Sequence, residues 1–177
     1  MKKILAFAGS TSSTSINKKL ATFAAENLEN TAFDIIDLRD FEMPMYSEDE
    51  EKNGFSENAK KFSSLLDTYD GFILSLAEHN GSYAAAFKNI FDWSTRVENN
   101  FFRDKPLLLM ATSPGRRGGQ TVLETGVQSF SRMGAKKIVF FSLPRFFDNF
   151  KEGKIVQQDL LVLLKEQVNK FENSVNQ

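Results

Sequence analysis

Five short apolar runs recur along the chain, and apolar residues at helical spacing follow each of them. The runs are residues 4–8, 33–38, 71–76, 106–111 and 138–141. Continuous apolar runs that end at turn residues are typical of buried strands, while the mixed run 33–38 suits an edge strand. Strands that alternate with helices predict a parallel sheet with helices on both faces and right-handed crossovers. We therefore expect an α/β fold with a five-stranded parallel sheet in the order 2-1-3-4-5.

Helices are expected where apolar residues recur every three or four positions. They cover residues 16–29, 55–69, 83–94, 122–133 and 160–171. The segments 40–54 and 144–153 are polar or irregular, and we expect them to be connections at the surface. Since the chain contains no internal repeat and no linker, a single domain over residues 1–177 is expected.

The composition excludes several functions. A net charge of −1 argues against nucleic acid as a partner, and the absence of cysteine removes disulfides, thiol catalysis and iron–sulfur clusters. A histidine-based metal site would rest on His79 alone, so no metal is expected. The first apolar run is too short for a signal peptide or a membrane span, which makes the cytoplasm the expected location, without a membrane partner.

The segment 8–17, Ala-Gly-Ser-Thr-Ser-Ser-Thr-Ser-Ile-Asn, lies between the first strand and the first helix. Small hydroxyl residues before a helix expose backbone N–H groups next to the positive end of the helix dipole, which suits a phosphate. The same residues also serve as simple helix caps. From this segment alone, both interpretations stay open.

Three irregular loops follow the first, third and fourth predicted strands, at 9–17, 77–82 and 112–119. In a parallel sheet these loops open on the same edge, where ligands bind at the reversal of strand order. The first loop lacks both the Gly-x-Gly-x-x-Gly pattern and the P-loop pattern. A small-molecule site for a phosphate-bearing cofactor held by hydroxyl groups is therefore expected, and sheets of this kind commonly hold FMN there.

Three blocks of the sequence resemble the NADPH-dependent FMN reductases. Gly9-Ser10 with Ser15-Ile16-Asn17 is similar to the phosphate loop of that family. Residues 78–82, Glu-His-Asn-Gly-Ser, are similar to its Glu-Tyr-Asn-Gly-Ser block, and 113–119 to its glycine loop. The resemblance implies a flavodoxin-like three-layer sandwich, FMN as cofactor, and NADPH or NADH as electron donor. It also implies a homodimer or homotetramer whose partner subunit closes part of the pocket.

Transferred by position, the resemblance implies three groups of cofactor-binding residues. Around the FMN phosphate it places Ser10, Ser15, Ile16 and Asn17. Along the edge of the isoalloxazine ring it places Glu78, His79, Asn80 and Gly81. Bordering the other side of the ring and the ribityl chain it places Ser113, Gly115 and Gly118.

Some positions depart from the family pattern. Thr11 stands where the family usually has a cation, and Arg116 or Arg117 are candidates to compensate. Ala77 and His79 replace the usual Pro and Tyr. His79 is a candidate proton donor to a reduced quinone, although a single histidine on a surface loop is more often a solvated side chain. No other catalytic residue is expected, because the cofactor carries the chemistry.

Four phenylalanines fall in predicted connections and are candidates to line the flavin pocket or a subunit interface. They are Phe101, Phe102, Phe146 and Phe147.

Two functions remain open at this stage, besides the possibility of a flavin-free scaffold that has lost the site. The first is an FMN-dependent NAD(P)H oxidoreductase that passes electrons by a ping-pong cycle to a quinone, an azo compound, a free flavin or a metal oxyanion. The second is a flavodoxin-like electron carrier without substrate turnover. Carriers are usually strongly acidic and have a second glycine in the phosphate loop, whereas this chain is near neutral and lacks that glycine, which favours the oxidoreductase.

Overall fold

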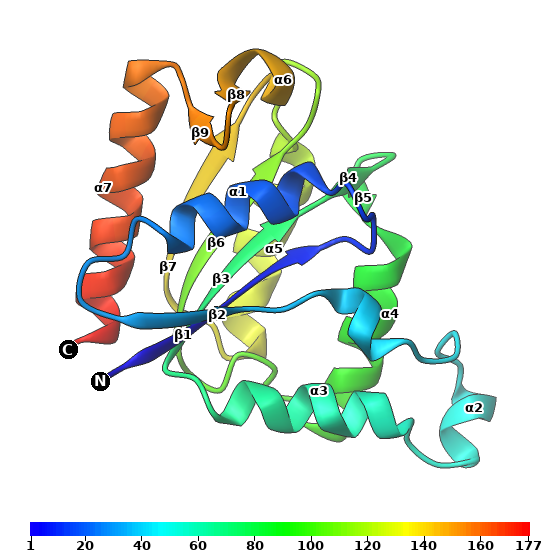
Figure 1. Ribbon diagram of the computed structural model, residues 1–177. Helices are drawn as coiled ribbons and strands as arrows, with labels where there is room; N and C mark the ends of the chain where they lie inside the picture. Colours follow the sequence, from blue (N-terminus) through cyan, green and yellow to red (C-terminus); the bar gives the residue numbers. More distant parts are fainter.

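The centre of the protein is a five-stranded parallel sheet, shown in Figure 1 in the computed structural model, which describes residues 1–177. Its strands are β1 (Lys3–Gly9), β2 (Ala32–Ile35), β3 (Gly71–Leu76), β6 (Pro106–Thr112) and β7 (Lys136–Leu143). They lie in the order β2-β1-β3-β6-β7, which confirms the predicted order 2-1-3-4-5. The order reverses at β1, which pairs with β2 on one side and β3 on the other.

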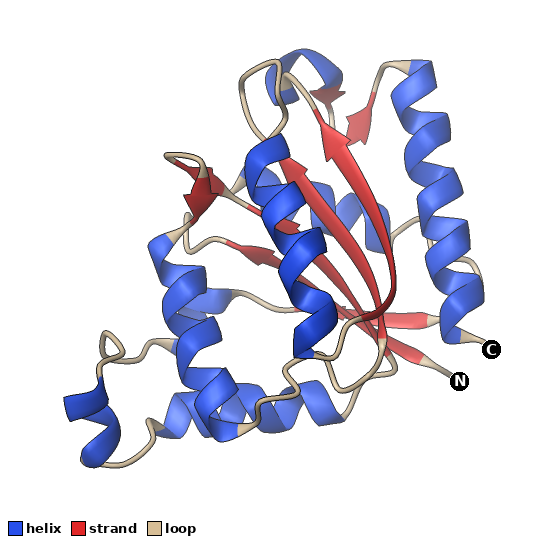
Figure 2. Ribbon diagram, turned by 180° about the vertical axis from the view of Figure 1, so that it is seen from behind, coloured by secondary structure: helices blue, strands red, loops and turns tan.

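Helices cover both faces of the sheet (Figure 2). On one face lie α1 (Ile16–Ala25) and α7 (Gln158–Val175), and on the other α3 (Glu57–Asp67), α4 (Ala85–Val97) and α5 (Gln120–Phe130). Successive strand residues point to opposite faces, so Leu5 and Phe7 belong to one core cluster and Ile4 and Ala6 to the other. None of the helices has both the length and the hydropathy needed to cross a bilayer.

Phe101 and Phe102 belong to the core beneath α4 and α5. Both are fully buried, and the Phe102 ring lies 4.9 Å from that of Phe130. The expectation that they line a pocket or an interface is therefore wrong. The connection that carries them is folded inward, unlike an ordinary surface loop. Burial of the two aromatic rings contributes more free energy than burial of the short backbone segment costs.

Short elements occupy segments expected to be irregular. In 40–54 the chain forms the 3-10 turn η1 (Leu38–Phe41) and the helix α2 (Glu48–Lys52). In 144–153 and just beyond it forms α6 (Phe146–Asn149), β8 (Phe150–Lys151) and β9 (Lys154–Ile155). A two-residue hairpin, β4 (Glu78–His79) and β5 (Ser82–Tyr83), follows β3, and η2 (Ser131–Met133) follows α5. These elements are too short to show the hydrophobic periodicity of a helix or a strand in the sequence.

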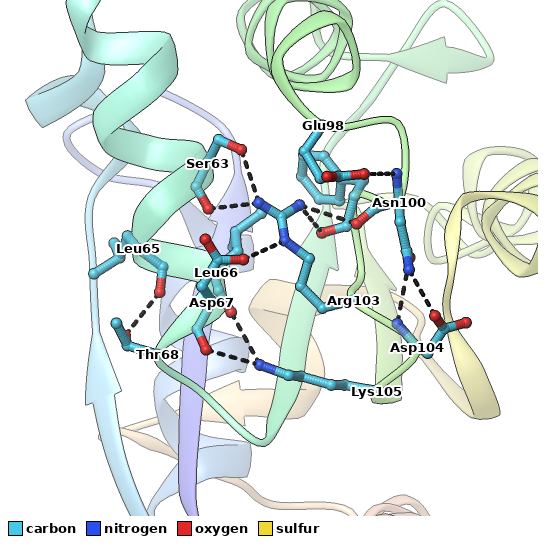
Figure 3. Close-up of polar contacts among 11 residues, drawn as sticks. Ser63, Leu65, Leu66, Asp67, Thr68, Glu98, Asn100, Arg103, Asp104 and Lys105 are labelled. Carbon is cyan, nitrogen blue, oxygen red and sulfur yellow. Dashed lines mark hydrogen bonds and ion pairs between the residues drawn. The ribbon is translucent and has the colours of Figure 1, made fainter.

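The edge of the sheet where the strands begin is fastened by Arg103 (Figure 3). Its guanidinium donates to the carbonyl and hydroxyl of Ser63, to the Asp67 carboxylate at 2.6 Å, and to the carbonyls of Asn100 and Phe101. These contacts use all five guanidinium N–H donors. They tie the α4–β6 connection to the C-terminal half of α3, at the end of the sheet opposite the three loops.

Candidate active site

A hollow of about 390 Å³ lies at the carboxyl ends of β1, β3 and β6, and we call it the central hollow. It brings together the three loops that the sequence predicts to converge. The residues that line it are Ser10, Ser12, Thr14, Ser15, Ile16, Asn17, Ala77, Glu78, His79, Thr112, Ser113, Pro114 and Phe147. Seven of the eleven predicted cofactor-binding residues are among them, and Asn80, Gly81, Gly115 and Gly118 are not.

The loop from Ser10 to Ser15 is held by its own hydroxyl groups. The Ser10 Oγ accepts from the Ser12 N–H at 3.2 Å, and the Ser12 Oγ accepts from the Thr14 N–H at 3.3 Å. The Ser15 Oγ accepts from the Lys18 N–H at 3.1 Å and so caps α1. The hydroxyl-rich sequence therefore first of all shapes the loop, which is the role of Ser and Thr in such turns.

Five backbone N–H groups between Ser10 and Asn17 have no acceptor in the protein: those of Ser10, Thr11, Ser13, Ile16 and Asn17. The last two lie in the first turn of α1, whose N–H groups carry the positive end of the helix dipole. Unpaired N–H groups around a helix N-terminus bind phosphate and carboxylate well. The segment thus caps α1 and also has the geometry of an anion cradle, so the two interpretations of the sequence are compatible.

The side chain of Asn17 serves the sheet. Its Oδ1 accepts from the Ser75 hydroxyl at 2.7 Å and from the Thr112 N–H at 3.0 Å, while its Nδ2 donates to the Thr112 carbonyl at 3.2 Å. The residue is only 3% exposed. Asn17 therefore clamps α1 to β3 and β6, while its backbone N–H and the second N–H of its amide are left without a partner.

The segment after β3 is a tight hairpin. Glu78 pairs with Tyr83 and His79 with Ser82, and the two residues between have φ values of 52° (Asn80) and 75° (Gly81). Positive φ at both turn positions is the requirement of a type I′ hairpin turn, which Asn-Gly fulfils best. Asn80 and Gly81 thus set the position of Glu78 and His79, which line the central hollow themselves.

Glu78 lies between the hairpin and the start of α5. Its Oε2 accepts from the Val122 N–H at 2.9 Å, in the first turn of that helix. A carboxylate at this position compensates the positive end of the helix dipole. The Glu78 carboxylate therefore occupies the positive end of α5.

The loop 113–118 is fastened to the segment after β7. The Ser113 and Gly115 carbonyls accept from the backbone N–H groups of Phe146 and Arg145, at 3.0 and 2.9 Å. These bonds bring the neighbouring Phe147, whose ring is 63% exposed, to the wall of the central hollow. Phe147 therefore lies where the sequence placed it as a candidate, whereas Phe146 is buried in the core.

The charges near the cradle are mostly paired. The Lys18 Nζ lies 2.6 Å from the Asp37 carboxylate, which also accepts from Arg39. The bonds from Arg39 outweigh burial and, with those from Lys18, hold the pKa of Asp37 well below its usual range. Since Lys18 is neutralised in this way and Thr11 carries no charge, the cradle consists of neutral donors. Neither Arg116 nor Arg117 lines the hollow.

The chain is similar to known proteins in sequence and in fold. Residues 2–147 match the family model of the NADPH-dependent FMN reductases. An NAD(P)H-dependent FMN reductase of Pseudomonas aeruginosa is 27% identical over 72% of this chain and 76% of its own. A 2-hydroxy-1,4-benzoquinone reductase of a Burkholderia species is 31% identical over 66% of this chain and 63% of its own. The flavoenzyme FerB of Paracoccus denitrificans, an NAD(P)H:(acceptor) oxidoreductase, has a similar structure, with a TM-score of 0.78, 22% identity, and coverage of 99% and 98% of the two chains.

Proposed function

The chain belongs to the NADPH-dependent FMN reductases, a family of oxidoreductases with FMN and NAD(P)H as cofactors, and we propose that it reduces small-molecule acceptors by a ping-pong cycle. In the first half, NAD(P)H gives up a hydride and leaves as NAD(P)⁺. In the second half, a quinone takes up two electrons and two protons and leaves as a hydroquinone. One of those protons comes from the medium, since NAD(P)H supplies only one.

The residues of the central hollow fit FMN. The observation that carries the proposal is the set of unpaired N–H groups at the start of α1, which the neighbouring loops enclose in one hollow. When bound there, FMN supplies the chemistry, because its N5 accepts a hydride and its ring returns two electrons. The N–H groups of Ile16 and Asn17, with the hydroxyls of Ser10 and Ser15, would hold its phosphate.

The other two loops would position the ring. Glu78 and His79 form one wall, and Ser113 with its glycine loop forms the other. Asn80, Gly81 and Gly118 would act through the shape of these walls, and Gly115 through its backbone carbonyl, which accepts from the Arg145 N–H. Because the hollow is open, NAD(P)H and the electron acceptor would approach the same face of the flavin ring one after the other. This shared face is the basis of the ping-pong order. The exposed His79 or water would supply the proton that the acceptor needs.

Quinones are the acceptors that we propose first. The benzoquinone reductase of Burkholderia supports this choice, and Phe147 offers an exposed aromatic ring at the hollow for stacking. Azo compounds, free flavins and metal oxyanions are further candidates. We also propose that the protein is a homodimer or homotetramer in the cytoplasm. The exposed Met45 and Phe55, on either side of α2, are apolar side chains that a subunit interface would cover, and light scattering tests the oligomeric state.

Anaerobic mixing of the FMN-loaded protein with NADPH tests the function. The visible flavin absorption band should bleach, and p-benzoquinone added afterwards should restore it with release of one hydroquinone per flavin. Initial rates at several quinone concentrations should give parallel double-reciprocal lines. If the band does not bleach, the protein is an electron carrier that needs another donor, and the proposal is overturned.

A further inference from the structure

A second, larger hollow adjoins the central one. It has a volume of about 580 Å³ and lies between α1 and the segment from α6 to β9. Figure 1 shows these elements on the side of the sheet that carries α7. We call it the α1 groove. Thr14, Ser15 and Phe147 line both hollows, so the groove begins where the phosphate cradle ends. Its volume falls within the range of small-molecule sites.

The α1 groove extends along the helix away from the cradle. Lys19, Thr22, Phe23 and Glu26 line it in succession. At a rise of about 1.5 Å per residue, Ser15 and Glu26 lie about 16 Å apart along the axis of α1. The groove therefore has the length for a phosphate, a ribose and a base in sequence.

The walls of the α1 groove combine aromatic and charged groups. Phe146 stacks on Phe150 at 4.8 Å, Phe23 meets Phe150 edge-on at 5.7 Å, and the exposed Phe147 packs edge-on against Phe146. Lys19 is exposed and makes no ion pair. An unpaired ammonium suits a phosphate, and an anchored aromatic ring suits a base.

Two acidic side chains, Glu26 and Glu152, also line the α1 groove, and neither makes an ion pair. Carboxylates repel an anion, but they accept hydrogen bonds from ribose hydroxyls and from an adenine amino group. The mixture of one free cation, aromatic rings and carboxylate acceptors fits a nucleotide better than it fits a simple anion or an apolar ligand.

From this continuity we infer that the α1 groove is an adenylate subsite, so that the protein binds FAD as well as FMN. The inference rests on the proposed flavin site. The cradle would hold the phosphate next to the ribityl chain, Lys19 would meet the second phosphate, and the adenosine would lie against Phe147 or Phe23.

The charge of the cradle supports the same ligand. The terminal phosphate of FMN is a monoester with a charge of about −1.5 to −2 at neutral pH, as in other phosphate monoesters. The corresponding phosphate of FAD is a diester with a single negative charge. A cradle of neutral donors, with Lys18 bound to Asp37, compensates one charge more readily than two.

Binding of the two flavins tests the inference. The Kd values of FMN and FAD are measured by flavin fluorescence on flavin-free protein, for the wild type and two variants. Thr22→Tyr fills the groove and should raise the Kd of FAD about tenfold, whereas the Kd of FMN should stay unchanged. Lys19→Ala should raise the Kd of FAD about threefold and leave that of FMN unchanged. Lys170→Ala, which removes an exposed lysine near the C-terminal end of α7, is the matched control and should change neither.

Each outcome decides between the proposals. Wild-type binding of FAD at least as tight as that of FMN, with the selective effects of the variants, supports the adenylate subsite. FMN binding with FAD about 100-fold weaker overturns the subsite and leaves the proposed function intact. An equal effect of Thr22→Tyr on both flavins also overturns it. If that variant raises the KM for NADPH but not the Kd of FAD, the groove holds the adenylate of the hydride donor instead. Binding of neither flavin overturns both proposals.

Discussion

The Asn17 side chain is of a type that could bind a ligand, but in this fold it forms hydrogen bonds with the sheet. Its amide makes three hydrogen bonds, to the Ser75 hydroxyl and to both backbone groups of Thr112. Those partners lie 58 and 95 residues away in the sequence. No local pattern reports such contacts, so the sequence identifies the residue as important without revealing whether the cofactor or the fold needs its side chain.

Replacing Asn17 therefore tests the stability of the protein itself. We expect Asn17→Ala to lower the free energy of unfolding by about 2–3 kcal/mol, because the buried Thr112 N–H loses its acceptor. Ser15→Ala, which in the flavin-free protein removes the cap of α1, should cost about 1 kcal/mol. Urea unfolding of flavin-free protein gives both values. A smaller loss for Asn17→Ala than for Ser15→Ala would contradict the role of Asn17 as a clamp.

Two glycines of the 113–118 loop provide a second comparison at this scale. Gly118 has a φ of 57°, and a Cβ there would lie 2.9 Å from the backbone of Leu143 and Pro144. A Cβ on Gly115 would meet the Ser113 Oγ at 3.8 Å, an ordinary contact. We expect Gly118→Ala to lower the free energy of unfolding by about 1–3 kcal/mol and to weaken FMN binding by displacing Ser113. Gly115→Ala should do neither, and calorimetry with flavin titration checks both variants.

At the scale of elements, long periodic segments are predictable and short ones are not. The strand 71–76 has the predicted bounds, whereas α1 ends at Ala25 instead of residue 29, because the chain turns there toward β2. The edge strand β7 is longer than predicted at both ends, since the polar Lys136 pairs with Pro106 ahead of an irregularity in the register and Leu143 pairs with Thr112. The β8–β9 hairpin lies in a segment without hydrophobic periodicity, so the sequence does not predict it. For the same reason the sequence does not predict the wall of the α1 groove to which this hairpin contributes.

The connection between α1 and β2 depends on a buried carboxylate from α7. Glu172 accepts from the N–H groups of Glu29 and Asn30 and from the Thr31 hydroxyl, at 2.7 to 3.2 Å. Burial by itself raises the pKa of Glu172, but these hydrogen bonds hold it below its usual range. The stabilisation by Glu172 is therefore fully present above the pKa that a glutamate has in the unfolded chain, about 4.3. It is lost as the pH falls through the lower pKa of Glu172 in the folded protein.

We expect Glu172→Gln to remove part of this acid sensitivity. At neutral pH the variant should be less stable than the wild type by about 1–2 kcal/mol, because a neutral acceptor replaces a charged one. Below about pH 4 the difference should shrink, since the wild-type carboxyl is then becoming protonated as well. Thermal unfolding between acid and neutral pH measures it. Glu166→Gln, at an exposed position of the same helix, is the control, and an equal effect of both variants would contradict the assignment.

At the scale of the whole molecule, the two ends of the sheet have different tasks. The loops at the carboxyl ends of β1, β3 and β6 build the hollow, and this convergence follows from topology alone, which is why the sequence predicts it. At the opposite edge, Arg103 fastens the α4–β6 connection to α3. That contact depends on a side chain that packs inward from a left-handed position, with φ of 55°, which nothing in the sequence indicates.

Arg103→Met tests this separation. The Arg103 side chain is only 10% exposed, and its loss removes five guanidinium hydrogen bonds, among them those to the Ser63 and Phe101 carbonyls, so the free energy of unfolding should fall by about 2 kcal/mol or more. The Asp67 carboxylate contributes little to this loss because it is mostly exposed. The Kd of FMN should stay unchanged, since the site lies at the other edge of the sheet. Arg132→Met, at an exposed arginine without an ion pair, should alter neither quantity. If Arg103→Met weakens FMN binding as strongly as Gly118→Ala does, the two edges are coupled through the sheet, and the scaffold cannot be treated as independent of the site.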